Sequence, residues 1–168
     1  RILVAAASVA FLVAIGGITL WMAEKKSAKI IAGASTVVST NEGEKARIFL
    51  SDSTKIIINS GSKIEYQSGY NVNERVVKLN GEAFFDVQTN PEKPFLVKLG
   101  EMTISAVGTQ FNVLSYENEE RNETTLEEGS LKVEIPGKES IELKAGQQFV
   151  FFKKKKKAVV RDVNTETY

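Results

Sequence analysis

The chain contains neither cysteine nor histidine among its 168 residues. Without cysteine there can be no disulfide, no thiol nucleophile and no cysteine-based zinc site. Without histidine the chain lacks the commonest general base and the commonest transition-metal ligand, and no Ser-His-Asp triad can form. The sequence therefore predicts no catalytic residue, no metal site and no bound cofactor.

An excess of charge of one sign is also lacking. The 22 basic and 21 acidic residues leave a net charge of +1. A balanced chain creates no overall field that would attract a polyanion, so we expect no nucleic-acid partner.

Two pairs of carboxylates are the remaining candidates for acid–base chemistry. Glu82 and Asp86 are four residues apart in a predicted strand, so they share a face but lie roughly 13 Å apart along it. Glu127 and Glu128 precede a glycine and are interpreted as turn residues. Glycoside hydrolysis needs two carboxyl groups about 5–9 Å apart, so we interpret both pairs as solvated turn or sheet-edge residues.

Residues 2–22 form the one long apolar run, with no charged residue and with Ser8 and Thr19 as the only polar side chains. A helix of this length rises roughly 31 Å, which matches the hydrocarbon core of a bilayer. Trp21 lies at the end of the run, where amphipathic aromatic rings settle at headgroup level. A secretory signal peptide is the alternative, but its apolar core is shorter and ends in a small-residue cleavage site. The run predicts a retained transmembrane helix over residues 1–24.

The sidedness of this helix is not decided by the local charges. Lys25, Lys26 and Lys29 follow the run, which by the positive-inside rule alone would place the following domain in the cytoplasm. The rule compares two flanks, however, and we expect residues upstream of Arg1.

Short apolar or alternating runs rich in Val, Ile, Thr, Phe and Tyr fill the rest of the chain, which is typical of an all-β domain. The predicted strands are Ala46–Leu50, Lys55–Ile58, Lys63–Tyr66, Arg75–Leu79, Glu82–Val87, Phe95–Leu99, Met102–Val107, Phe111–Tyr116, Asn122–Leu126, Leu131–Ile135, Ser140–Leu143, Gln148–Phe152 and Ala158–Asp162. Asn80-Gly81 between two of them predicts a hairpin with a type I′ turn. The spacing of the apolar residues does not distinguish among a sandwich, a jelly roll and a β-roll.

Five consecutive lysines, Lys153–Lys157, are the one extreme charge feature. We interpret them as a solvated hairpin tip between two strands, kept from aggregating by its charge. Attraction to anionic lipid headgroups or to an acidic partner is the functional alternative.

Seven short blocks of the sequence lie in order at 40–54, 58–66, 75–87, 93–97, 107–113, 124–133 and 143–147. RVVKLNGEAFFDV at 75–87, for example, fits the pattern R-x-V-x-L-x-G-E-A-Y/F-F-D/E-V. Together these blocks resemble the FecR-type anti-sigma regulators of Gram-negative bacteria, above all those of Bacteroidetes-type organisms. Ser53 departs from the pattern, which usually has glycine there, and we expect a different turn type without loss of the fold.

The resemblance implies a single-pass inner-membrane regulator with its β domain in the periplasm. The implied organisation is a transmembrane helix at 1–24, a linker or first strand at 25–39, the FecR-type β domain at 40–160 and a linker at 161–168 to a further C-terminal domain. The implied partners are an ECF sigma factor, bound through a cytoplasmic domain before the helix, and the signalling domain of a TonB-dependent outer-membrane transducer, met mainly through the C-terminal domain. A regulatory protease is a further implied partner.

Two other classes of protein stay open at this point. One is a membrane-tethered module that binds a glycan or an envelope protein without any sigma factor. The other is an envelope hydrolase, which would need two acidic side chains converging in a pocket.

Overall fold

The computed structural model describes residues 16–18 and 34–164. The chain divides into two compact units, Arg1–Ala34 and Ser35–Tyr168. In the first unit only residues 16–18 and 34 are described, and residues 16–18 are helical. Within the described ranges there is no helix with the length and hydropathy of a membrane span. Most of the predicted transmembrane segment, and residues 25–33 of the predicted linker, lie outside the described residues.

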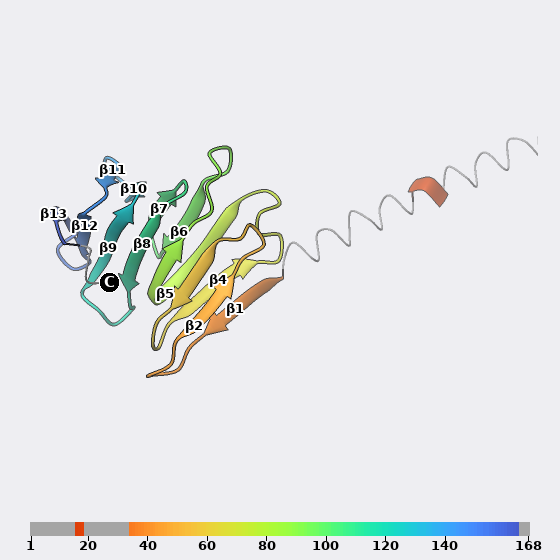
Figure 1. Ribbon diagram of the computed structural model, residues 1–168, viewed down its shortest axis with the longest axis horizontal. Coiled ribbons are helices and arrows are strands. Elements are labelled where there is room, and N and C mark those ends of the chain that lie inside the picture. The colour runs from red at the N-terminus through yellow and green to blue at the C-terminus, as the bar shows by residue number, and fades with distance from the viewer. Residues whose placement is uncertain (1–15, 19–33, 165–168) are drawn as a thin grey trace, which may run out of the picture. The chain divides into compact units, whose positions relative to one another are not determined.

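The second unit is all-β, as predicted (Figure 1). Its strands are β1 (Ser35–Ser39), β2 (Ala46–Phe49), β3 (Lys55–Ile58), β4 (Lys63–Gln67), β5 (Arg75–Asp86), β6 (Phe95–Leu99), β7 (Met102–Ala106), β8 (Gln110–Ser115), β9 (Arg121–Glu128), β10 (Ser130–Glu134), β11 (Ile141–Lys144), β12 (Gln147–Phe152) and β13 (Lys157–Asp162). The strand β1 falls within the segment 25–39, for which both a linker and a first strand were expected, and it pairs with β4.

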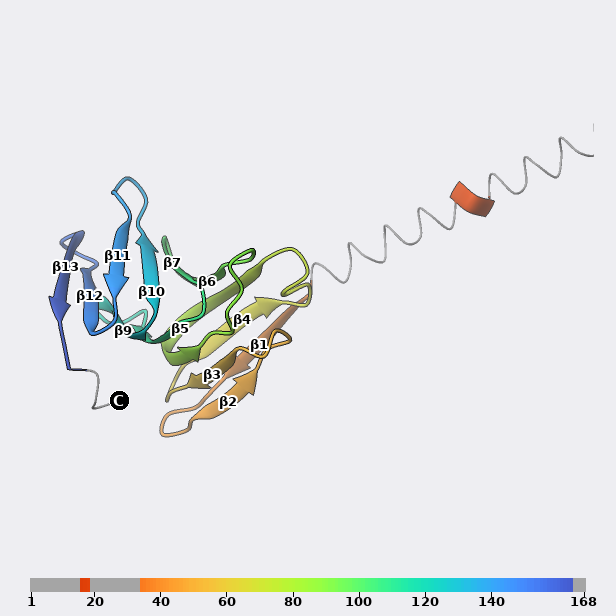
Figure 2. The same cartoon turned by 45° about the horizontal axis from the view of Figure 1, so that its top comes forward.

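The strands form two layers that share one strand. Sheet A has the order β1-β4-β5-β6-β7-β10-β11, and sheet B has the order β2-β3-β5-β8-β9-β12-β13. Every pairing among the described strands is antiparallel except that of β5 with β6. Figure 2 shows the strands β10 to β13 beside the rest of the strands. They are joined to them by the pairing of β10 with β7 and of β12 with β9.

The strand β5 passes from one layer to the other. Residues 75–80 pair with β4 and β6 in sheet A, and residues 81–86 pair with β3 and β8 in sheet B. A straight strand of its 12 residues would be roughly 40 Å long. Yet the Arg75 side chain, at the start of β5, reaches the carbonyl of Gln88, just beyond its end. The strand is therefore bent strongly back on itself, which closes one side of the fold.

The bend replaces the hairpin that was predicted at Asn80-Gly81, and that prediction was wrong. Both residues stay paired inside β5, Asn80 with Lys63 and Gly81 with Ser115. Gly81 has φ 118° and lies so close to Ser62 that a Cβ atom would be 2.6 Å from the Ser62 Cα. The freedom of glycine is used for a corner between two sheets and for close approach of another segment, not for a tight turn.

The turn before β4 satisfies the backbone at this corner, through one side chain and one backbone amide. The Ser62 hydroxyl accepts a hydrogen bond from the Glu82 amide at 2.8 Å, and the Asn59 amide donates to the Glu82 carbonyl at 2.8 Å. Thr40 holds the turn in place, because its hydroxyl donates to the Asn59 carbonyl at 2.6 Å and accepts from the Ser62 amide at 3.0 Å. Three of the sequence blocks thus meet at one structural corner.

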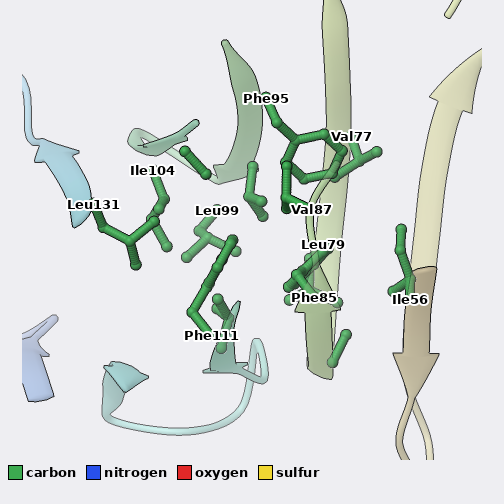
Figure 3. Packing of buried hydrophobic residues seen from close by; sticks show 14 of the residues in the cluster. Ile56, Val77, Leu79, Phe85, Val87, Phe95, Leu99, Ile104, Phe111 and Leu131 are labelled. Atoms are coloured by element: carbon green, nitrogen blue, oxygen red, sulfur yellow. The ribbon is translucent and has the colours of Figure 1, made fainter. Parts of the chain in front are cut away.

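The core fills the space between the two sheets with alternating residues of each strand. Figure 3 shows Phe95, Leu99 and Ile104 of sheet A packing near Phe85 and Phe111 of sheet B. Phe85 stacks on Phe111 with 5.0 Å between ring centroids and lies 5.8 Å from Phe95. Each aromatic ring buries a large apolar area, so these contacts help to fix how the two layers face each other.

Candidate functional site

The most elaborate polar arrangement in the described domain surrounds Arg75, whose side chain is fully buried. Its guanidinium group donates to three carbonyl oxygens of the segment between β5 and β6: those of Gln88 at 2.8 Å, Asn90 at 3.3 Å and Lys93 at 2.6 Å. It also forms an ion pair with Asp52 at 3.0 Å. A planar group with five donors suits this task, since it satisfies carbonyls that no strand partner can reach.

The Asp52 carboxylate accepts hydrogen bonds from three residues, and its side chain is only 7% exposed. The Tyr70 hydroxyl donates to it at 2.8 Å, and Thr54 donates through both its amide and its hydroxyl. Burial raises the pKa of the Asp52 carboxyl, but the hydrogen bonds from Tyr70, Thr54 and Arg75 outweigh this and hold that pKa below its usual value of 3.8. Asp52 is therefore ionised under ordinary conditions and permanently paired.

Tyr70 completes this arrangement, which we call the Arg75 node: Asp52, Thr54, Tyr70 and Arg75. Burial raises the pKa of the Tyr70 hydroxyl, and the neighbouring Asp52 carboxylate raises it further. The phenol stays protonated and donates to Asp52. Ser53 takes φ 70°, the left-handed conformation that glycine adopts most readily, so the loop closes despite the departure from the family pattern.

The carboxylates that were considered for catalysis do not converge. Glu82 accepts hydrogen bonds from Asn59 and Asn112, and Asp86 forms an ion pair with Lys55 at 3.0 Å. Both lie on the outward-facing side of β5, in line with the predicted shared face. Each carboxylate is held by its own cross-strand partners, which is the arrangement expected of sheet-stabilising pairs.

Glu127 and Glu128 are strand residues of β9, and their interpretation as turn residues was wrong. The strand continues because β8 pairs with it as far as Glu128, through an irregularity at Gln110/Phe111. The left-handed turn begins only at Gly129, which has φ 91°. One Glu127 carboxylate oxygen is buried and has no hydrogen-bond partner among the described residues.

The isolated position of Glu127 predicts a gain in stability when its charge is removed. Burial raises the pKa of the Glu127 carboxyl above its usual value of 4.5, so the folded state disfavours the ionised form. The free-energy cost of holding the ionised carboxyl in the folded state is fully present at neutral pH. It disappears as the pH falls below about 4.5, where the carboxyl is protonated in both the folded and the unfolded state. We expect Glu127→Gln to raise Tm at pH 7 by about 1–3 °C and to leave it unchanged near pH 4.

Glu128→Gln is the matched control, because this neighbour is exposed. Circular dichroism melts at the two pH values make the comparison. Equal effects of the two substitutions at pH 7 would contradict the account of Glu127.

A cleft of about 530 Å³ lies where four hairpins meet, beside the bend of β5. Its walls come from the β6–β7, β8–β9, β10–β11 and β12–β13 hairpins. Apolar side chains form its floor, and lysine and glutamate side chains stand at its rim. The lining residues are Leu79, Asn80, Leu99, Gly100, Glu101, Met102, Ser115, Glu117, Asn122, Ile135, Pro136, Lys138, Phe151, Lys153 and Lys156.

Residues 153–156 of the lysine run form the β12–β13 hairpin tip, as predicted, whereas Lys157 already begins β13; the tip adjoins this cleft. Lys153 is anchored there, since its ammonium group donates to the Tyr116 carbonyl at 2.6 Å. Lys154 pairs with Glu120 of the β8–β9 hairpin. The run is therefore fixed against the neighbouring hairpin at its first two residues.

No cluster of acidic side chains that could hold a metal ion occurs in the described part of the chain. The polar residues that the structure does bring together, in the Arg75 node and at the Gly81 corner, are engaged in holding loops and turns. Sequence reasoning noted Arg75 only as the start of a block, and it missed Tyr70 altogether. The available signal was an arginine at the first position of a largely apolar strand. A buried arginine requires a partner, so this position could have indicated a buried ion pair.

These features define an all-β module whose shared sequence blocks serve folding and whose open cleft is lined mostly by residues outside those blocks. The chain belongs to the FecR protein family, whose model matches residues 36–132. Among curated proteins none matches the chain.

The solved structures that resemble the domain include two crystal structures of a proposed anti-sigma factor from Parabacteroides distasonis, at 2.50 Å and 1.65 Å resolution. They match with TM-scores of 0.75 and 0.74 at 26% identity, over 79% and 78% of this chain. The matched region is 62% and 61% of those chains, so this chain spans under two thirds of their length.

Proposed function

We propose that this chain is part of a transmembrane regulator of the anti-sigma type. The observation that carries the proposal is the FecR family match over most of the β domain, together with the similarity to the Parabacteroides protein. The apolar run at residues 2–22, just before the domain, supports a membrane tether.

The proposed regulator is a single-pass protein of the inner membrane with the β domain in the periplasm. Its N-terminal side would hold an ECF sigma factor in the cytoplasm, and its C-terminal side would meet the signalling domain of a TonB-dependent outer-membrane transducer. A protease would free the sigma factor when the transducer binds its substrate. In this role the chain passes on a signal and catalyses no reaction.

The internal construction of the β domain suits a scaffold between these two ends. The Arg75 node and the Gly81 corner tie together segments that are distant in the sequence, such as Thr40 with Ser62 and Asp52 with Arg75. Buried, fully hydrogen-bonded networks of this kind favour one rigid arrangement. A rigid body can transmit a displacement or shield a cleavage site, whereas a flexible linker cannot.

Deletion of residues 40–148 from the intact regulator tests the proposed role. We expect transcription from the sigma factor's target promoter to become independent of the transducer's substrate, because the two ends are no longer joined by the scaffold. A reporter gene behind that promoter, measured with and without the substrate, gives the result.

Immunoblots of the membrane fraction must show that the deleted protein is still present and inserted. Induction by the substrate as in the intact protein would refute the scaffold role. Constitutive or absent expression with a stable protein would support it.

A further inference from the structure

The cleft beside the lysine hairpin is a feature of the described domain that its internal packing does not use. Its floor is apolar, with Leu99 and Met102 buried and with Ile135 and Phe151 half-buried beside the opening. The volume of about 530 Å³ lies within the range of ligand-binding clefts.

The rim of the cleft carries charges of both signs, with an excess of lysine on one side. Lys153 and Lys156 come from the β12–β13 hairpin and Lys138 from the β10–β11 hairpin, while Glu101 and Glu117 stand on the other two hairpins. The remaining lysines of the run extend the positive side beyond the cleft. Of the five, only Lys154 has an ion pair with a carboxylate among the described residues.

Five adjacent like charges on one hairpin repel one another, and the described part of the fold offers them a single acidic partner. A ligand that supplies carboxylates would relieve this repulsion, and apolar groups on the same ligand would cover the floor. We propose that the cleft binds an acidic, amphipathic peptide segment of a partner protein, with its carboxylates on the lysine rim and its apolar side chains in the cleft.

The rim favours a peptide over a membrane surface. A flat anionic bilayer cannot reach a floor that is recessed between four hairpins, and Glu101 and Glu117 would repel its headgroups. A peptide can place its acidic residues toward the lysines and neutral ones toward the glutamates. The proposal concerns the cleft alone and stands whether or not the chain regulates a sigma factor.

Fluorescence anisotropy with the purified full chain in zwitterionic detergent tests the proposal. The probe is a fluorescein-labelled peptide, acetyl-Asp-Leu-Glu-Phe-Asp-Leu-Glu-amide. One control peptide has serine in place of Leu and Phe, and a second has lysine in place of Asp and Glu. We expect micromolar binding of the probe that weakens with added salt, and binding of both controls that is at least about tenfold weaker.

Charge reversal locates the binding site. The double variant Lys153→Glu/Lys156→Glu should weaken binding by about tenfold or more, since two attractive charges become repulsive. Lys45→Glu/Lys144→Glu makes the same change of charge at exposed lysines outside the cleft and should leave the affinity within about twofold. Unchanged thermal melts of both variants show that the fold is intact.

Several outcomes would overturn the assignment. They are equal loss of affinity in the two double variants, equal binding of the serine peptide, and no saturable binding up to about 1 mM. Vesicles of phosphatidylglycerol provide a further test. If they displace the probe, and do so less well after Lys153→Glu/Lys156→Glu, the cleft binds lipid and the peptide proposal is refuted.

Discussion

Replacing Arg75 with alanine is expected to lower the free energy of unfolding by about 3–5 kcal/mol, the largest effect of any single charged residue in the described domain. The substitution leaves the Asp52 carboxylate, 7% exposed, without its counter-ion. It also removes the donors to the carbonyls of Gln88, Asn90 and Lys93. Buried polar groups without partners carry their full desolvation cost. Chemical denaturation by urea, followed by circular dichroism, measures the loss.

Arg47→Ala is the matched control for this prediction. Arg47 lies exposed on the edge strand β2, so its loss should change stability by less than about 0.5 kcal/mol. The double variant Arg75→Leu/Asp52→Asn should recover part of the stability lost in Arg75→Leu, because no buried charge is then left unpaired. A loss equal to that of Arg47→Ala would show that water replaces the guanidinium group without cost.

Lowering the pH should remove the stability that the Arg75 node contributes. The Asp52 carboxyl has a pKa below its usual 3.8, so the stability that it contributes is present above that value and is lost as the pH falls through the lower, folded-state pKa. The stability difference between the wild-type chain and Asp52→Asn should therefore shrink as the pH is lowered from 7 toward 3. The direction of this change distinguishes a paired carboxylate from one held neutral by burial.

Gly81→Ala is expected to destabilise the domain by about 3 kcal/mol or more, and to prevent folding if the total stability is small. Gly81 has φ 118°, which residues with a side chain rarely adopt. A Cβ there would lie 2.3 Å from the Ser62 hydroxyl oxygen and 2.6 Å from its Cα. The backbone of Ser62 would have to move, and with it the hydrogen bond to the Glu82 amide. The yield of folded protein and Tm give the measurement.

Gly61→Ala separates conformational strain from steric overlap. Gly61 also has a positive φ, 60°, but a Cβ at this position would have no neighbouring atom within 4 Å. This variant should cost only about 1 kcal/mol. Equal effects at the two glycines would mean that backbone strain alone, and not the approach of Ser62, makes glycine necessary at the corner.

Much of the fold could be predicted from local sequence. The strands Lys55–Ile58 and Phe95–Leu99 agree with the structure at both ends, because their short apolar runs are bounded by turn residues on either side. The hairpin tip at the lysine run was predicted for the same reason. The pattern could not distinguish a corner from a turn at Asn80-Gly81, since either use of glycine interrupts the alternation in the same way.

The composition and periodicity by themselves determined that the domain is all-β and that it lacks thiol and imidazole chemistry. The order of the blocks along the chain was enough to indicate the FecR family. These properties follow from which side chains are present and from contacts between near neighbours in the chain. The tertiary structure alone decided that β5 serves two sheets, that Arg75 is buried against Asp52, and that four hairpins enclose a lysine-rimmed cleft. Each of these depends on pairing between residues 13 or more positions apart, such as Arg75 with Gln88 and Asp52, and local propensity does not encode such partners.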